Sequence, residues 1–269
     1  MTSRALSSPE ELAATLRAAG CVFAEDEARL LLAQARTPAE LGELVRRRVF
    51  GEPLEQVLGW AEFHGLRVAV EPGVFVPRRR TELLVDEAVR AARSVAAPRV
   101  PVVVDLCCGS GAVAAAVAAE LAPAVDLHAG DVDPAAVACA RHNLAGLAQV
   151  HRGDLFGALP VALRGQLDVV DACTPYVPSG EVRFMPPEAR DHEPLVALDG
   201  GADGLDVVRR LLAGARAWLR AGGFVAVETS ERQAPLAADA FARAGLVPAV
   251  VTDEALGATV VTGSSPESG

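Results

Sequence analysis

From Val100 to the C-terminus, the sequence alternates between short apolar runs and longer amphipathic segments. The apolar runs predict strands at 102–105, 125–131, 148–151, 167–172, 224–228, 247–252 and 258–261. The segments between them predict helices at 111–121, 134–145, 203–220 and 232–244. This alternation indicates an α/β fold with a largely parallel, doubly wound sheet and right-handed crossovers. Ligands of such sheets bind at the carboxyl ends of the strands, so the residues after each strand are the first site candidates.

The part of the chain before this alternation predicts a small helical domain and a linker. Ser8-Pro-Glu-Glu and Thr37-Pro-Ala-Glu each combine a side-chain N-cap, a proline at the first helical position and an early acidic residue. Two further helices are expected at 25–35 and before Gly59. Between Glu62 and Pro77 the pattern predicts two strands around the turn Glu71-Pro-Gly73. We therefore divide the chain into a helical domain (1–60), a β-hairpin linker (61–78) and an α/β domain (79–269).

Composition excludes several classes of function. The chain has 25 basic and 35 acidic residues, and all the basic ones are arginine. The absence of lysine excludes pyridoxal phosphate Schiff bases and Walker-type phosphate loops, and the net charge of -10 argues against sequence-independent nucleic-acid binding. Neither a signal peptide nor a membrane span is expected, which predicts a cytoplasmic protein. The five cysteines and five histidines show no metal-binding spacing, so we expect no metal.

Glycines and acidic residues follow the first three predicted strands of the α/β domain. Gly109 and Gly111 let the backbone approach a ligand closely at the start of a helix. Together with Ala114 they also satisfy the dinucleotide fingerprint, which leaves a nicotinamide enzyme as an alternative. Asp105, however, would repel a pyrophosphate and attract the sulfonium and amino groups of S-adenosylmethionine. With Asp131 for the ribose and Asp154 for the adenine amine, the three acids suit this cofactor in that order.

The same motifs resemble those of class I S-adenosylmethionine-dependent methyltransferases. More narrowly, the chain resembles the family that methylates a glutamine side-chain amide in peptide-chain release factors. The resemblance covers most of the chain, including its helical N-terminal part. It rests on these segments: Gly51-Glu-Pro-Leu, Leu58-Gly-Trp-Ala-Glu-Phe-His-Gly65, Pro72-Gly-Val-Phe-Val-Pro-Arg78, Arg80-Thr-Glu-Leu-Leu84, Gly130-Asp-Val-Asp-Pro134, Gly153-Asp-Leu-Phe156, Pro187-Glu-Ala-Arg-Asp-His-Glu-Pro194, Ala197-Leu-Asp-Gly-Gly-Ala-Asp-Gly-Leu205 and Gly222-Gly-Phe-Val-Ala-Val-Glu228.

This resemblance implies a set of site residues. The implied cofactor-binding set contains the three acids, the glycine turn, the residue after the ribose acid, an aromatic ring that flanks the base, and the cysteine of the turn after the fourth strand. Its members are Asp105, Cys107, Gly109, Gly111, Asp131, Val132, Asp154, Phe156 and Cys173. The mouth of the substrate site is implied at four positions: Arg78, Thr81, Arg190 and Glu193. Cys107 departs from the family, which usually has its first glycine there.

The turn that should catalyse the reaction departs from the family too. The family's Asn-Pro-Pro-Tyr turn is replaced here by Cys173-Thr-Pro175-Tyr176. In the family, the asparagine side chain and the next backbone carbonyl accept hydrogen bonds from the amide nitrogen that is methylated. A thiol is a poor acceptor, and Asn143 lies in a predicted helix too far along the chain to replace it.

Three functions remain open on the sequence alone. The first is methyl transfer at Cys173, Pro175 and Tyr176 to an acceptor other than release-factor glutamine, either a small molecule or a protein. The second is a lyase reaction, in which an atom of S-adenosylmethionine attacks its own γ-carbon, releasing methylthioadenosine and a small cyclic amino acid. Cys173 as a thiolate, Tyr176, Asp171 or Glu228 could then help to position or deprotonate the substrate, and the sequence does not rank them. The third is a non-catalytic protein that binds the cofactor or a partner. The sequence does not indicate an oligomeric state.

Overall fold

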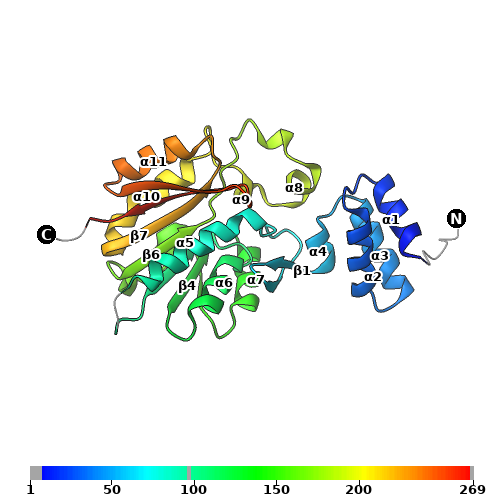
Figure 1. Ribbon diagram of the computed structural model, residues 1–269, viewed down its shortest axis with the longest axis horizontal. Helices are drawn as coiled ribbons and strands as arrows, with labels where there is room; N and C mark the ends of the chain where they lie inside the picture. Colours follow the sequence, from blue (N-terminus) through cyan, green and yellow to red (C-terminus); the bar gives the residue numbers. More distant parts are fainter. Residues whose placement is uncertain (1–7, 96–97, 267–269) are drawn as a thin grey trace.

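A seven-stranded sheet forms the centre of the computed structural model, which describes residues 8–95 and 98–266 (Figure 1). The strands lie in the order β5-β4-β3-β6-β7-β9-β8. Their bounds are β3 Val102–Leu106, β4 Asp126–Asp131, β5 Gln149–Arg152, β6 Leu167–Ala172, β7 Leu219–Thr229, β8 Val247–Asp253 and β9 Ala258–Ser264. The first five strands in this order are parallel, and β9 is antiparallel to both of its neighbours. The predicted α/β class and largely parallel sheet are confirmed.

Helices cover both faces of this sheet, as the alternation predicted. One face packs against α5 (Glu82–Arg93), α6 (Ala112–Leu121) and α7 (Pro134–Asn143) through a continuous apolar core. The other face packs against α10 (Asp206–Trp218) and α11 (Ala234–Arg243) through a second core. The central strands therefore have apolar side chains on both faces, and polar side chains inside these layers need a special reason.

The N-terminal part is a separate helical cluster with its own core (Figure 1). It contains α1 (Pro9–Ala18), α2 (Ala24–Gln34), α3 (Pro38–Val49) and α4 (Leu54–Leu58). The two predicted N-caps form: Ser8 Oγ accepts the Glu11 amide, and Thr37 Oγ1 accepts the Glu40 amide, both at 3.2 Å. Gly59 ends α4 in a left-handed conformation, with φ of 81°. The four helices agree with the sequence analysis, whereas the domain boundaries stay a prediction.

The predicted hairpin exists but turns at a different place. Its strands are β1 (Trp60–Phe63) and β2 (Leu66–Ala69), so the turn is His64-Gly65 and not Glu71-Pro-Gly73. Both turn residues have positive φ, 50° and 73°, as a two-residue type I′ hairpin requires. The expected second strand at Val74–Val76 is wrong, because this segment is irregular and runs into the cavity described below.

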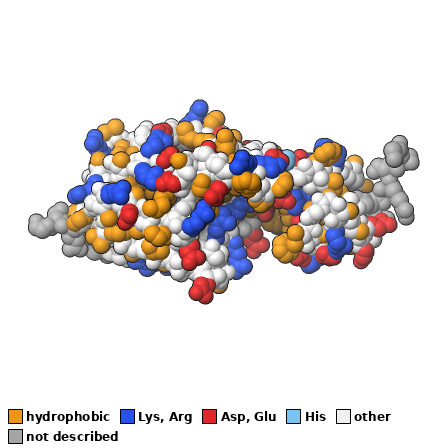
Figure 2. All heavy atoms as spheres, turned by 90° about the horizontal axis from the view of Figure 1, so that it is seen from above, with side chains coloured by type: hydrophobic (Ala, Val, Ile, Leu, Met, Phe, Trp, Pro, Cys, Tyr) orange, Lys and Arg blue, Asp and Glu red, His pale blue; other side chains and the backbone are white. Residues whose placement is uncertain are grey.

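Short helices lie in the connections between these elements. They are η1 (Arg79–Thr81), η2 (Leu155–Ala158), η3 (Val161–Leu163), η4 (Val182–Phe184), α8 (Pro187–His192) and α9 (Leu195–Leu198). The face shown in Figure 2 carries interspersed arginine and acidic side chains. None of the helices in the described residues is both long and apolar enough to span a bilayer, and the cytoplasmic location stays a prediction.

Candidate active site

A cavity of about 470 Å³ lies at the carboxyl ends of β3, β4 and β6. Pro53 and five segments of the chain line it: the glycine turn at 107–113, the segment 131–136, the turn 173–177, and the segments 74–81 and 185–198. The first two segments belong to the predicted cofactor side, and the others surround the space where an acceptor would lie. One continuous cavity therefore joins the two halves of the predicted site.

The conformation of the glycine turn is fixed by left-handed backbone angles and by hydrogen bonds to one carboxylate. Gly109 and Gly111 have φ of 53° and 78°, and Cys107 shares this left-handed conformation with φ of 58°. A Cβ on Gly111 would lie 2.9 Å from Leu144 Cδ1, which explains the requirement for glycine. Asp131 accepts the amides of Gly109 and Asp133 at 2.9 Å each. Burial raises the pKa of Asp131 despite these bonds, so an additional donor, such as a ribose hydroxyl, would stabilise its charged form.

The predicted cofactor residues divide into those that line the cavity and those that do not. Five of them line the cavity: Cys107, Gly109, Asp131, Val132 and Cys173. Gly111 is outside the lining and contributes through its left-handed backbone conformation in the turn. Asp154 is exposed, forms an ion pair with Arg210 and is absent from the lining.

Phe156 requires a correction. Its ring is 6% exposed and stacks on Trp218, with 5.6 Å between ring centroids, inside the core between the sheet and α10. A ring fixed in this core does not flank a base in the cavity. Sequence reasoning placed it correctly after β5 but could not know that α10 would cover it.

Asp105 lies beneath the glycine turn, as predicted, but entirely within the protein. It is 1% exposed, and its Oδ2 accepts the Ala114 amide of α6 at 3.1 Å. Burial raises the pKa of Asp105 to about 8. Its carboxyl therefore lies below the site without lining it, and it would act on a cationic ligand through the charge it acquires on ionising rather than by contact.

The turn after β6 is part of a polar network that ends at Glu228. Cys173 Sγ lies 3.8 Å from Glu228 Oε2, and the Tyr176 hydroxyl donates to Glu228 Oε1 at 3.1 Å. Arg80 donates to the Tyr176 hydroxyl at 2.6 and 2.9 Å and to Glu228 at 3.1 Å. Burial is the main reason that the pKa values of Cys173 and Tyr176 are raised, and the Glu228 carboxylate adds to both shifts. The thiol and the phenol are therefore neutral at physiological pH.

This network contains one residue that the sequence analysis did not select for the site. Arg80 was quoted only as part of a motif, yet it lines the cavity and joins Tyr176 to Glu228. Its partners lie 96 and 148 positions further along the chain, so no local pattern could have indicated the contact. Glu228 was a candidate for positioning or deprotonating the substrate. Its carboxylate lies beside the Cys173 thiol but does not line the cavity.

The four predicted mouth residues do not behave alike. Arg78 donates to the buried carboxylate of Glu193 at 2.6 Å, and both line the cavity. Thr81 also lines it, with a buried Oγ1 that has no hydrogen-bond partner. Arg190 is the exception, because its guanidinium pairs with the adjacent Asp191 on the surface and is absent from the lining. Its predicted place at the mouth is not supported by this position.

Two other predictions can be compared with the described residues. Groups of three or more His, Cys, Asp or Glu side chains that could hold a metal ion are absent from the part of the chain that the structure describes. Asn143 lies at the end of helix α7, as expected, and its amide bonds to the hairpin and the glycine turn rather than to the turn 173–176. Its amide accepts from Ala69 N and donates to Ala69 O and Ser110 O, at 2.8 to 2.9 Å.

Comparisons with known proteins agree with this geometry. Residues 65–169 match the family model of the methyltransferase small domain. The chain is 41% identical to the release factor glutamine methyltransferase of Streptomyces coelicolor, over 80% of this chain and 73% of that protein. It is 44% identical to the protein of the same name from Gloeobacter violaceus, over 76% of this chain and 71% of that protein.

A third relative has a different name, and solved structures share the fold. The 4-amino-L-phenylalanine/4-methylamino-L-phenylalanine methyltransferase of Streptomyces pristinaespiralis is 35% identical over 73% of this chain and 67% of that protein. A methyltransferase structure from Pyrococcus furiosus superposes with a TM-score of 0.54 and 15% identity, over 82% of this chain and 97% of that one. At this identity the superposition supports the Rossmann-like fold alone.

Proposed function

We propose, from the premise that this chain belongs to the family of release factor glutamine methyltransferases, that it methylates an acceptor other than a glutamine side-chain amide. The family membership confirms the enzyme class and the cofactor: the protein is an S-adenosylmethionine-dependent methyltransferase. The nicotinamide alternative and the non-catalytic binder are therefore not pursued further. The acceptor and the residues that act on it are the subject of the proposal.

The cofactor side of the cavity suits S-adenosylmethionine. We assign Asp131 to the ribose hydroxyls, because its carboxylate lines the cavity and could accept further hydrogen bonds. Burial raises its pKa, so hydroxyl donors would stabilise its charged form. Gly109 and Val132 would contact the nucleoside, and Asp105 would attract the cationic amino-acid end from below. When bound, the cofactor supplies an electrophilic methyl group on a sulfonium. The protein's own residues must then orient the acceptor and exclude water.

Cys173 carries the proposal, because a thiol cannot replace the amide oxygen that the family uses. Methylation of a planar amide nitrogen requires strong acceptors that hold its N–H groups, and sulfur is a weak one. The neutral Cys173 thiol lies 3.8 Å from Glu228 Oε2, so its proton is directed toward that carboxylate. The sulfur lone pairs are weak hydrogen-bond acceptors and would not hold the N–H groups of an amide. The cavity wall at this position is better suited to a nitrogen that already has a free lone pair.

A relative supports an amine acceptor of this kind. The Streptomyces pristinaespiralis protein is named for methylation of an aromatic amine, and it is 35% identical to this chain. An aromatic amine is neutral at physiological pH and needs orientation more than activation. The apolar residues on the acceptor side, such as Phe75, Pro175 and Met185, can pack against a ring. We therefore place small aromatic amines first among acceptors to be tested.

The product formed from S-adenosylmethionine tests the proposal. The purified protein is incubated with the cofactor alone, with aromatic amines and with a release factor, and the nucleosides are identified. S-adenosylhomocysteine that forms only with an amine is the expected result. Methylation of the release-factor glutamine by the wild type would refute the proposal. Methylthioadenosine formed without an acceptor would refute it in favour of the lyase reaction, which none of the relatives named above supports.

Restoring the family residue provides the matched variant. Cys173→Asn should gain measurable transfer to glutamine and lose transfer to the amine, because the amide oxygen again holds a planar N–H. Cys21→Ala, a change in the core of the helical domain at a cysteine outside the cavity lining, serves as the control and should leave both rates within about twofold. A Cys173→Asn protein with unchanged preference would contradict the assigned role of Cys173.

A further inference from the structure

Two carboxyl groups lie side by side beneath the glycine turn. Asp105 on β3 and Asp171 on β6 are direct neighbours in the parallel register of these strands. They are 1% and 0% exposed, and both project into the layer beneath α5 and α6. Asp105 Oδ2 accepts one amide, while Asp105 Oδ1 and both oxygens of Asp171 have no hydrogen-bond partner. Such a pair needs an explanation, because isolated buried carboxylates are costly.

Among the residues that the structure describes, no cation acts on either carboxyl of the pair. The strand neighbours on the outer sides are Ala129 and Ala226, and α5 and α6 cover this face with apolar side chains. The ionisable groups near the pair are acids or thiols: Asp131, Cys107, Cys108 and Cys173. Arg80, the cation that acts on Cys173, is already bonded to Tyr176 and Glu228. Two carboxylates in this layer cannot both be ionised, so the pair must hold a proton.

The asymmetry between the two groups decides which of them holds this proton. Asp105 accepts the Ala114 amide in the first turn of α6, and both the bond and the helix dipole favour its charged form. Asp171 lacks a comparable donor, and burial raises its pKa well above the ordinary value. Asp171 is therefore the neutral acid of the pair. Its hydroxyl has a natural acceptor in the adjacent carboxyl of Asp105.

We propose that Asp171 is a positioning residue that remains protonated and donates a hydrogen bond to Asp105, which keeps Asp105 able to ionise beneath the cationic end of the cofactor. The inference rests on the proposed cofactor orientation, with the amino-acid end above Asp105. It requires nothing of the methyl acceptor. Its consequence is that cofactor affinity depends on a residue that never contacts the cofactor.

Removal of the donor should therefore weaken binding of the charged ligand. In Asp171→Val, the Asp105 carboxylate loses a hydrogen bond to a charged group, and S-adenosylmethionine should bind about tenfold more weakly at neutral pH. The midpoint of the pH dependence of its Kd should rise by about one unit. Asp171→Asn retains an N–H donor toward Asp105, so its Kd should stay within about threefold of the wild type.

The experiment measures Kd by calorimetry between pH 5.5 and pH 9, roughly the range around the Asp105 pKa of about 8. S-adenosylmethionine is compared with adenosine, which lacks both cationic groups. The affinity for adenosine should not change in any variant. Asp168→Asn is the control: Asp168 lies on the same strand but bonds to Arg99 and the Val102 amide at the opposite end. Equal binding by Asp171→Val and the wild type would overturn the proposal. So would an Asp171→Asn protein as weak as Asp171→Val.

A second measurement covers the case in which Asp171→Val does not fold. At about pH 9.5, above the Asp105 pKa of about 8, the ligand-free wild type should show the infrared carbonyl absorption of a buried neutral carboxylic acid, and this band should disappear in Asp171→Asn but persist in Asp168→Asn. Absence of the band from the wild type would refute the proposal. Because both readouts use no acceptor, their outcome is independent of whether the proposed amine is the true substrate.

Discussion

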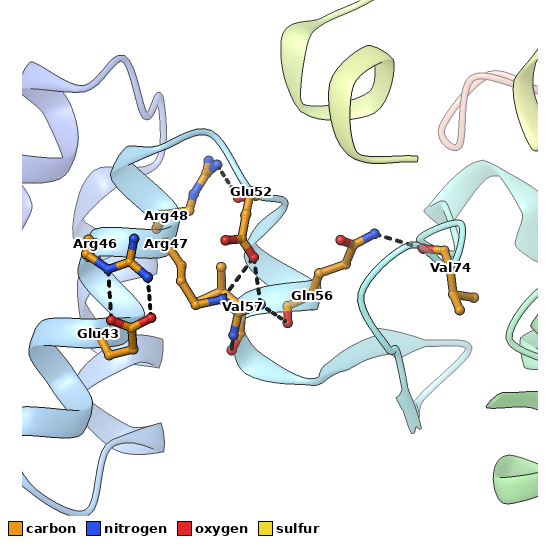
Figure 3. A network of polar contacts seen from close by, with 8 residues as sticks. All are labelled: Glu43, Arg46, Arg47, Arg48, Glu52, Gln56, Val57 and Val74. Carbon is orange, nitrogen blue, oxygen red and sulfur yellow. Dashed lines mark hydrogen bonds and ion pairs between the residues drawn. The ribbon is translucent and has the colours of Figure 1, made fainter. Parts of the chain in front are cut away.

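Arg48 joins the helical domain to the wall of the cavity, and its loss should be among the most damaging single changes. Its side chain is 5% exposed and forms a two-point ion pair with Glu27, at 2.6 and 3.0 Å. Its Nη1 also reaches Glu188 of α8 at 2.7 Å and the carbonyl of Glu52 at 3.0 Å, the latter drawn in Figure 3. Glu188 lines the cavity, so the guanidinium connects three separate segments.

The substitution Arg48→Met keeps the apolar stem and removes the charge. Glu27, 6% exposed, would then be a buried carboxylate without a partner, and breaking a buried pair in this way costs about 3–5 kcal/mol. Arg46→Met on the same helix removes an exposed pair with Glu43 (Figure 3), which contributes about 0–1 kcal/mol. Urea unfolding of both variants measures the difference. The double change Arg48→Met with Glu27→Leu should recover much of the loss, because no buried charge remains.

Two outcomes would refute this reasoning. The first is an Arg48→Met protein no less stable than Arg46→Met, and the second is a double variant as unstable as the single one. The position of Glu188 adds a functional consequence. Loosening of α8 should raise the KM for the acceptor while leaving the Kd for S-adenosylmethionine nearly unchanged.

Three further predictions address the cofactor side. Gly111→Ala forces a Cβ into a left-handed residue, 2.9 Å from Leu144, and should cost about 1–2 kcal/mol or more in chemical denaturation and weaken cofactor binding. Asn143→Ala removes the bonds that tie the hairpin to the glycine turn, and calorimetry should show weaker cofactor binding with a stability loss of roughly 2–4 kcal/mol. The ligand-free protein should lose stability as pH rises from about 4 toward 8, because burial raises the folded-state pKa of Asp105 to about 8 and its ordinary value is about 3.9. Urea unfolding midpoints measured across this pH range test the last prediction. The dependence of the midpoint on pH should become weaker when the cofactor is present.

The sequence predicted the sheet well because each strand and helix has a strong local pattern. Strand β6 was placed at its observed bounds, and the α1 and α3 caps were identified by a hydroxyl side chain followed by proline. The hairpin turn was misplaced because Glu71-Pro-Gly73 matches a common turn composition. The true turn places the non-glycine residue His64 at positive φ, so His64-Gly65 is a weaker turn signal than Pro72-Gly73.

The site was predictable as far as it depends on strand ends. Asp131 and Cys173 follow strands whose neighbours in the sheet can be inferred from topology, and both line the cavity. Phe156 and Arg190 failed because side-chain direction is decided by packing partners, Trp218 in one case and Asp191 in the other. The Arg80–Glu228 contact joins residues 148 positions apart, and it depends on the three-dimensional fold rather than on any local motif.

The charges around the cavity differ between its two halves, and this difference bears on the acceptor. On the cofactor side, Asp105 and Asp131 have no arginine partner, so a cationic ligand finds uncompensated acids there. On the acceptor side, Arg80 and Arg78 pair with Glu228 and Glu193, and the turn itself contributes a neutral thiol and a neutral phenol. A protonated alkyl amine would have to lose its proton in a half-cavity whose described carboxylates, Glu188, Glu193 and Glu228, are each paired with an arginine. A weakly basic aromatic amine arrives with its lone pair free, so this arrangement of charges favours it over alkyl amines as the acceptor.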